Sequence, residues 1–161
     1  MERLLTDEGY ILGAFGFIEL YRRLESPFKP RSEQVLMVLR KNSPYANHWS
    51  LPGGGVMRKE KIENTCKREV KEETDMNVSV GPLLGIVKFL GDDEKKYEAH
   101  CFRCKPLNFG FKKGEEVYEI KRVDYRNLKR DQIDTYKIAP PTWFFLKLIK
   151  ENRRRPFIES L

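Results

Sequence analysis

The stretch Gly54–Met76, GGVMRKEKIENTCKREVKEETDM, decides how the rest of this chain is arranged. Its central part holds three glutamates, Glu69, Glu72 and Glu73, at positions i, i+3 and i+4. On an α-helix this spacing places the side chains on one side, about one turn apart, where like charges repel. A hard divalent cation removes that repulsion, because Mg²⁺ binds carboxylate oxygens and links them to substrate phosphates. The pattern therefore points to metal binding on a helix.

A helix is predicted to follow the glycine-rich turn Leu51–Gly55 directly. Ile62, Cys66 and Val70 recur at helical spacing and would form its apolar stripe. Glycine has no Cβ, so the turn can approach a ligand closely. The turn and the helix together therefore predict a site between them.

The three acids are expected at the edge of the buried helix face. Projected at roughly 100° per residue, Glu69 and Glu73 fall close to the apolar stripe, and Glu72 flanks it. Carboxylates held at such an edge need a partner. The alternative is a solvated charged face, on which the acids are neutralised by basic neighbours: Lys67, Arg68 and Lys71.

The same stretch resembles the Nudix box of the Nudix hydrolase superfamily. The matching positions are Gly54, Glu60, Arg68-Glu69-Val70, Glu72-Glu73 and Met76, preceded by a similar lead-in, Trp49–Gly54. Asp75 stands where the family has the glycine that ends the helix in a left-handed conformation. Aspartate tolerates that conformation better than most residues, so we expect the helix to end at the same place.

The resemblance implies a fold and a domain organisation. It implies an α/β protein, a Nudix-type α/β/α sandwich around a mixed β-sheet, with one domain over residues 1–161. The residues alone support only an α/β or α+β protein with a C-terminal helix. We expect strands over residues 10–22, 34–40, 96–105 and 115–124, one or two strands over 78–90 broken at Gly81-Pro82, a turn over 26–32, and a helix over Thr142–Asn152 after Pro140-Pro141.

The resemblance also implies a metal site. Mg²⁺ or Mn²⁺ would be bound by Glu69, Glu72 and Glu73, with the carbonyl of Gly54 as a further ligand. Phosphoanhydride hydrolysis requires mainly positioning and charge neutralisation, with a metal-activated water as nucleophile and a carboxylate as proton acceptor. Arg68 is expected to orient the helix acids, and Glu60 to support it near the helix start.

Two positions outside the box complete the predicted site. Family members often use one more glutamate from a late loop or strand, which corresponds to Glu116, with Glu115 and Glu119 as alternatives. The strand over residues 34–40 ends at Arg40, where the family usually has a basic residue. Arg40 would hold a substrate phosphate or be a plain charge at a strand end.

The implied reaction is cleavage of a phosphoanhydride bond in a nucleoside diphosphate linked to another group. The expected substrate is a nucleoside triphosphate or a nucleotide sugar, because the sequence does not match the markers of narrower subfamilies. One alternative is an RNA 5′-end pyrophosphohydrolase. Another is a non-catalytic nucleotide-binding module of Nudix fold, against which the intact carboxylates argue.

Composition limits the partners and the compartment. The net charge of +7 favours polyanionic ligands such as nucleotides, with RNA as the less favoured partner. A C-terminal basic cluster is interpreted as a solubilising tail rather than an RNA-binding patch: Lys147, Lys150, Arg153, Arg154 and Arg155. No run approaches the ~20 apolar residues of a membrane span, and three cysteines favour a reducing, cytoplasmic setting over a disulfide scaffold. A monomer and a homodimer both remain open.

Three further residue groups are interpreted as structural. Cys101 and Cys104 form a lone CxxC on an expected strand, where residues three apart point to opposite faces and cannot bind one metal. Trp49 is expected to anchor packing rather than stack on a base. His48 and His100 show no acid–base partner in the sequence.

Overall fold

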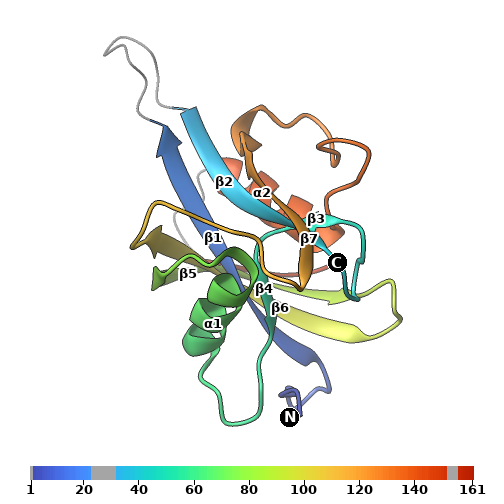
Figure 1. The fold of residues 1–161 in the computed structure, drawn as a ribbon. Helices are drawn as coiled ribbons and strands as arrows, with labels where there is room; N and C mark the ends of the chain where they lie inside the picture. Colours follow the sequence, from blue (N-terminus) through green and yellow to red (C-terminus); the bar gives the residue numbers. More distant parts are fainter. Residues whose placement is uncertain (1, 23–31, 152–155) are drawn as a thin grey trace.

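Residues 2–22, 32–151 and 156–161 are described in the structure, a computed structural model (Figure 1). The elements follow in the order β1 (Ile11–Arg22), β2 (Ser32–Arg40), β3 (Trp49–Ser50), β4 (Gly53–Gly55), α1 (Ile62–Thr74), β5 (Val78–Leu90), β6 (Lys96–Pro106), β7 (Val117–Val123), the 3-10 helix η1 (Tyr125–Asn127), α2 (Pro140–Lys150) and β8 (Phe157–Ser160). The predicted strands and both helices are present, with ends shifted by one or a few residues.

The strands form one mixed sheet. Within the described residues it has eight strands, in the order β3-β2-β1-β6-β5-β8, with β4 paired to β1 and β7 paired to β2. The pairs β1–β6 and β5–β8 are parallel, and the other pairs are antiparallel. Strand β1 is central, because it pairs with β2, β4 and β6.

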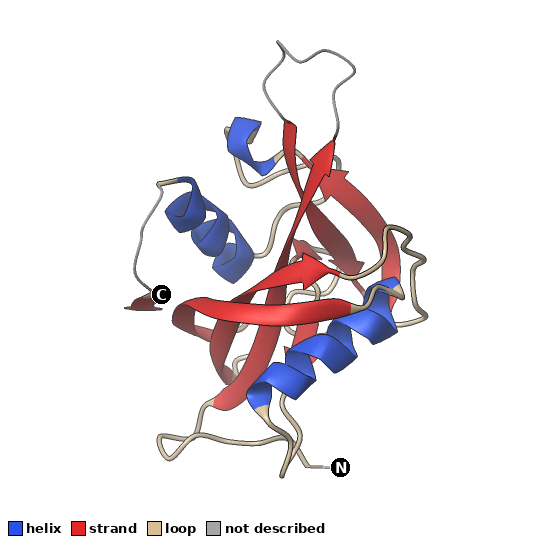
Figure 2. Cartoon of the chain, turned by 90° about the vertical axis from the view of Figure 1, so that its left-hand side faces the viewer, coloured by secondary structure: helices blue, strands red, loops and turns tan. Residues whose placement is uncertain are grey.

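The two helices cover opposite faces of the sheet (Figure 2). On one face, Cys66 and Val70 of α1 pack in a core cluster with Ala14 and Ile18 of β1. On the other face, Phe145 and Leu146 of α2 pack in a second cluster with Phe17 of the same strand, β1. The predicted α/β/α sandwich is therefore confirmed. None of the helices in the described part of the chain is long and apolar enough to cross a membrane.

The strands differ from the expected ones in two respects. Strand β5 is continuous through Gly81-Pro82, and the irregularity is absorbed by register shifts against β6. Strand β8 was not predicted; it adds to the sheet edge by parallel pairing with β5. At Gly16, β1 pairs with β6 without a register shift. A Cβ on Gly16 would lie 3.0 Å from Val70 Cγ2, so glycine lets α1 approach the sheet.

The left-handed end of α1 is confirmed. Asp75 has φ 59° and ψ 12°, and its backbone N–H donates to the carbonyl of Lys71. The Lys71 ammonium also lies 2.9 Å from the Asp75 carboxylate. Aspartate therefore ends the helix where the family has glycine. Most of the expected turn over residues 26–32 and the end of the expected C-terminal helix lie outside the described residues; Ser32 begins β2.

Candidate active site

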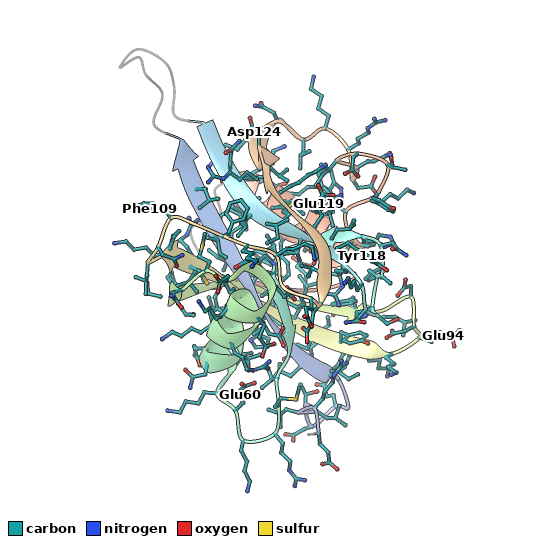
Figure 3. All side chains as sticks on the ribbon, in the orientation of Figure 1. Glu60, Glu94, Phe109, Tyr118, Glu119 and Asp124 are labelled. Carbon is teal, nitrogen blue, oxygen red and sulfur yellow. The ribbon has the colours of Figure 1, made fainter. Side chains whose placement is uncertain are left out.

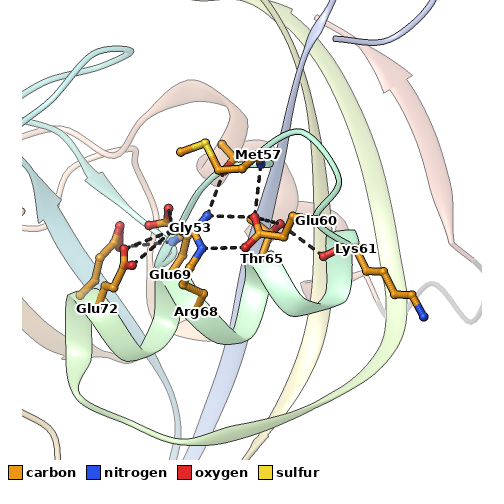
Figure 4. A network of polar contacts seen from close by, with 10 residues as sticks. Gly53, Met57, Glu60, Lys61, Thr65, Arg68, Glu69 and Glu72 are labelled. Carbon is orange, nitrogen blue, oxygen red and sulfur yellow. Dashed lines mark hydrogen bonds and ion pairs between the residues drawn. The ribbon is translucent and has the colours of Figure 1, made fainter. Parts of the chain in front are cut away.

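The guanidinium of Arg68 is the centre of a polar network on α1 (Figure 4). Its Nε donates to Oε2 of Glu60 at 2.8 Å, and its Nη2 donates to Oε1 at 3.0 Å. Its Nη1 donates to Glu69 at 2.9 Å and contacts Glu72 at 3.3 Å. Nη2 also donates to the carbonyl of Gly55 at 3.3 Å. One side chain therefore joins the loop before the helix, the glycine turn and two of the predicted metal-binding acids.

Glu60 is held as a carboxylate by this network. The hydrogen bonds from Arg68 are the main reason that the pKa of Glu60 is lowered to about 2, with burial acting in the opposite direction. The Thr65 hydroxyl at 2.6 Å and the Met57 backbone N–H at 3.2 Å also donate to Glu60. Glu60 therefore balances the charge of Arg68 and fixes the plane of its guanidinium.

Three carboxylates from two distant parts of the chain come together. Oxygens of Glu69, Glu72 and Glu116 all lie within 4.8 Å of one another; Glu69 is buried and the other two are exposed. The donors are all carboxylate oxygens, which Mg²⁺ and Mn²⁺ prefer and softer metals do not. The residues present therefore fit a hard divalent cation.

Glu73 lies apart from this group, deeper in the protein. It is 5% exposed, and its Oε2 accepts a hydrogen bond from the backbone N–H of Gly53 at 3.2 Å. Burial raises the pKa of Glu73 well above its usual range, and the negative charge of Glu69 adds to this. Burial also raises the pKa of Glu69, against the opposing effect of Arg68. Both acids therefore lie on the buried side of the helix, as their positions relative to the apolar stripe predicted.

Glycine is required where β4 crosses α1. A Cβ on Gly54 would lie 2.5 Å from the carboxyl carbon of Glu69. Strand β4 is held at this position by antiparallel pairing of Gly53–Gly55 with residues 13–15 of β1. The backbone of the turn can therefore lie directly against the acid only because position 54 has no side chain.

Glu116 reaches the site because the preceding loop is bonded to the end of α1. The backbone N–H of Lys112 donates to the carbonyl of Thr74, and the N–H of Gly114 donates to the carbonyl of Glu73, each at 2.9 Å. These carbonyls have no partner within the helix, so the loop satisfies them. Two residues later the chain brings Glu116 beside Glu69 and Glu72.

The alternatives Glu115 and Glu119 are not part of the carboxylate group formed by the described residues. Glu119 lies on β7 next to Tyr118, both labelled in Figure 3, and its nearest cation is Lys121 at 4.0 Å. Of the three glutamates considered for the late position, the structure therefore brings Glu116 to the acids of α1.

A cavity of about 620 Å³ opens over this group. Its wall includes the glycine turn and two groups of side chains suited to a nucleotide. It also includes the acids Glu69, Glu72, Glu73 and Glu116. The cations are Arg3, Arg40, Lys41, Arg58, Lys59 and Arg68, and the aromatic side chains are Phe15, Phe89 and Tyr97. The rings of Phe89 and Tyr97 are stacked, with centroids 5.3 Å apart.

Arg40 lies inside the cavity rather than at a free strand end. It is partly buried, and its Nε donates to the carbonyl of Pro44 at 2.7 Å. Burial lowers the pKa of Arg40, while the nearby charge of Glu73 acts in the opposite direction. An arginine so placed can bind an anionic group next to the acidic site.

Arg3 and Tyr97 were missed in the sequence. Both line the cavity, but neither belongs to a local motif. The one sequence signal near them is the predicted strand over residues 96–105, in which Tyr97 lies close to the start. His100 was expected to have no acid–base partner, which is wrong: its Nε2 lies 2.8 Å from Glu98, on the same face of β6.

The structural interpretations of tryptophan and cysteine are confirmed. Trp49 is fully buried, and its Nε1 donates to Asp134 at 3.1 Å. Cys101 and Cys104 belong to different core clusters on opposite faces of the sheet. All three cysteines are free and buried.

The basic C-terminal cluster is only partly described. Residues 153–155 lie outside the described part of the chain. Of the remaining members, Lys147 lies over the rings of Trp143 and Phe144, and Lys150 donates to the carbonyl of Leu128 at 3.0 Å. These contacts supply no separate argument for RNA binding.

Known proteins share part of this sequence. An ADP-ribose pyrophosphatase of Methanocaldococcus jannaschii is 30% identical over 109 residues, which cover 67% of this chain and 64% of that protein. A diphosphoinositol polyphosphate phosphohydrolase of Mus musculus is 33% identical over 72 residues, covering 45% of this chain and 42% of the relative. The matched part therefore spans less than two thirds of either relative's length.

Solved structures show the same fold. A MutT protein from Methanosarcina mazei superposes with a TM-score of 0.67 and 28% identity, covering 90% of this chain and 96% of that one. A Nudix hydrolase from Nitrosomonas europaea gives a TM-score of 0.69 at 18% identity, covering 99% of this chain and 88% of that one. A family model described as NUDIX domain matches residues 27–161. Because that match covers most of the chain and contains the whole box, this protein belongs to the Nudix hydrolase family.

Proposed function

We propose that this chain hydrolyses a phosphoanhydride bond in a nucleoside diphosphate linked to another group, with a divalent metal ion as cofactor. The observation that carries the proposal is the approach of the Glu69, Glu72 and Glu116 carboxylates to within 4.8 Å of one another. They lie on the wall of a cavity large enough for a nucleotide. Three clustered carboxylates without a cation would repel one another.

The proposed ligands for Mg²⁺ or Mn²⁺ are Glu69, Glu72 and Glu116. Glu73 and the carbonyl of Gly54 are further ligands proposed from the box. Bound there, the metal would neutralise phosphate charge and lower the pKa of a coordinated water. Family membership supports this choice, since dependence on a divalent metal is typical of Nudix hydrolases.

The side chains of this protein would then orient the groups and transfer the proton. Arg68 holds Oε1 of Glu69 at 2.9 Å, which leaves Oε2 of Glu69 to accept a proton from the attacking water. Burial raises the pKa of Glu69, which makes its carboxylate a stronger proton acceptor than an exposed one. Arg40 would bind a phosphate oxygen beside the acids.

The proposed substrates are nucleoside triphosphates or nucleotide sugars. The names of the relatives support both classes: one is an ADP-ribose pyrophosphatase, and another, from Bacillus subtilis, is a putative 8-oxo-dGTP diphosphatase with 40% identity over 55 residues. Cations and aromatic side chains share the cavity, as a ligand with phosphates and a base requires. Three free, buried cysteines support a cytoplasmic location.

The test is a substrate screen with purified protein. Nucleoside triphosphates, nucleotide sugars, ADP-ribose, a diphosphoinositol polyphosphate and a 5′-triphosphorylated RNA are incubated with Mg²⁺ or Mn²⁺, and products are identified by mass. Hydrolysis in ¹⁸O-labelled water shows which phosphorus atom is attacked. We expect turnover of a nucleotide that stops in excess EDTA.

The variant Glu72→Gln should lower turnover by roughly two orders of magnitude or more, because a charge is lost where the metal binds. The matched control is Glu63→Gln, an exposed position in the first turn of the same helix. Full activity of Glu72→Gln, or full activity in EDTA, would refute the proposed function. A protein that binds nucleotides but releases no product would be a binding module.

A further inference from the structure

The N-terminal segment is attached to the chain that follows the glycine turn. The backbone N–H of Leu4 donates to the carbonyl of Val56 at 2.8 Å, and the N–H of Arg58 donates to the carbonyl of Glu2 at 2.9 Å. Arg3, between these two bonds, is paired with this segment in an antiparallel bridge. The backbone of Arg3 is therefore fixed beside the proposed site, although it is more than 50 residues from the box in sequence.

The side chain of Arg3 lies over Gly55 and lines the cavity. A Cβ on Gly55 would be 3.3 Å from Nε, 3.4 Å from Cδ and 3.6 Å from Cγ of Arg3. Gly55 is adjacent to Gly54, whose backbone lies against the Glu69 carboxylate. Arg3 is therefore a neighbour of the carboxylate group and not a remote surface charge.

Among the described residues, Arg3 and Arg40 differ from the other two arginines of the cavity wall, Arg58 and Arg68, in having no ion-paired carboxylate. Arg58 is paired with Glu2 at 3.2 Å, and Arg68 with Glu60 at 2.8 Å. Among the described residues, no carboxylate lies within ion-pair distance of Arg3. Its guanidinium, with five N–H donors, is therefore available to a ligand.

A second arginine faces the same cavity. The positive charge of Arg3 contributes to lowering the pKa of Arg40, and both charges act on the Tyr97 hydroxyl, whose pKa they lower against the larger effect of burial. Two cations that repel each other across a common space are both stabilised when an anion enters it. The carboxylate that acts most strongly on Arg40 is Glu73, which accepts a hydrogen bond from Gly53.

We propose that Arg3 and Arg40 together bind an anionic group of the substrate in addition to the diphosphate held at the carboxylates, and that Arg3 thereby selects nucleoside triphosphates over nucleotide sugars. The inference rests on the proposed function and narrows its substrate class. A nucleoside triphosphate carries a third phosphate that can bind Arg3. A nucleotide sugar presents neutral hydroxyls there, which leave the arginine without a charged partner.

The test compares Arg3→Gln with Arg130→Gln, an exposed arginine that does not line the cavity and gives the same change in net charge. kcat/KM is measured with Mg²⁺ for dGTP and for ADP-ribose. We expect Arg3→Gln to lose about 10-fold with dGTP, mainly through KM, because a charge-assisted hydrogen bond is lost. The loss with ADP-ribose should be under about 3-fold, and Arg3→Lys should restore part of the activity on dGTP.

Equal losses with both substrates, or no loss with dGTP, would overturn the selection by Arg3. A binding measurement separates this inference from the proposed function. The affinity of α,β-methylene-dGTP with Mg²⁺ is measured by calorimetry for the wild type, Arg3→Gln and Arg130→Gln. If the wild type hydrolyses nothing, the proposed function fails, and a weaker affinity of Arg3→Gln alone still supports the anion site. An affinity of Arg3→Gln equal to that of the wild type overturns the anion site at Arg3, whether or not the wild type hydrolyses a nucleotide. Thermal unfolding confirms that each variant is folded.

Discussion

Glu60 and Arg68 form a two-bonded ion pair, with Nε to Oε2 at 2.8 Å and Nη2 to Oε1 at 3.0 Å. This geometry fixes both the position and the plane of the guanidinium. Its remaining nitrogen, Nη1, is thereby directed at Glu69 and Glu72, the two acids of α1 that meet Glu116. A residue in the loop before the helix therefore controls the orientation of the proposed metal ligands without contacting them.

Glu60→Gln should destabilise the protein at neutral pH by about 1–2 kcal/mol, because a charge-assisted pair is lost. The pKa of Glu60 is lowered to about 2 in the folded state, against roughly 4.3 in an unfolded chain. Its contribution is therefore complete above about pH 4.5 and is lost as pH falls toward 2, since the unfolded chain binds the proton first. Urea unfolding at a series of pH values from 7 to 2.5 measures how this contribution to the free energy of unfolding is lost.

The free energies of unfolding of the wild type and Glu60→Gln should converge at low pH. The free energy of unfolding of Glu63→Gln, exposed on the same helix, should equal that of the wild type at every pH. A difference between wild type and Glu60→Gln that stays constant over this range would contradict the role of the ion pair. Turnover of Glu60→Gln should also fall by about 10- to 100-fold, as is typical when the support of a metal ligand is removed.

Gly54→Ala should abolish most activity while leaving the fold intact. The new Cβ would lie 2.5 Å from the carboxyl carbon of Glu69, so that side chain must leave its position beside Glu72 and Glu116. Gly110→Ala is the control, because a Cβ there meets nothing within 4 Å. The checks are turnover and circular dichroism. Wild-type turnover of Gly54→Ala would show that the approach of the turn to Glu69 is unimportant.

Glu73→Gln should stabilise the metal-free protein even though it lowers turnover. The wild-type carboxyl is 5% exposed, and burial and the charge of Glu69 both oppose its ionisation. Glutamine keeps an oxygen for the Gly53 N–H but carries no charge. For a protein of this size, a gain of about 1 kcal/mol raises the Tm by about 2–4 °C.

Scanning calorimetry at pH 7.5 with and without Mg²⁺ measures this effect. Mg²⁺ should raise the Tm of the wild type more than that of Glu73→Gln, because the ion relieves a repulsion that the variant lacks. Glu72→Gln, at an exposed position, should change the Tm of the metal-free protein much less. A Tm of Glu73→Gln below that of the wild type would refute the prediction.

Gly114→Ala should disrupt both stability and catalysis. A Cβ at this position would lie 1.9 Å from the backbone carbonyl oxygen of Glu72, which cannot move without distorting the helix. The loop must therefore shift, losing its bond to the Glu73 carbonyl and moving Glu116 away from the other acids. We expect a loss of about 1–3 kcal/mol in unfolding free energy, measured in urea, together with a large loss of turnover. Gly110→Ala, in the same loop, should change neither.

The local sequence determined the helix and the side of it that carries the acids. Cys66 and Val70 repeat at helical spacing, and that period alone placed Glu69 and Glu73 toward the protein and Glu72 outside. The left-handed end at Asp75 is equally local, because it depends on the conformational tolerance of one residue. The succession of strands over most of the chain follows from the same short-range patterns.

Tertiary structure decided which distant groups meet. Glu116 joins the carboxylates only because loop N–H groups bond to the end of α1, and Arg3 reaches the cavity only because the N-terminal segment pairs beside Val56. Strand β8 likewise forms only by pairing with β5. The periodicity of a local stretch of sequence can indicate the direction of a side chain. Pairing between remote backbone segments, however, satisfies hydrogen bonds that no local pattern assigns. The sequence by itself therefore specified the acidic helix, and the packing of remote segments completed the site around it.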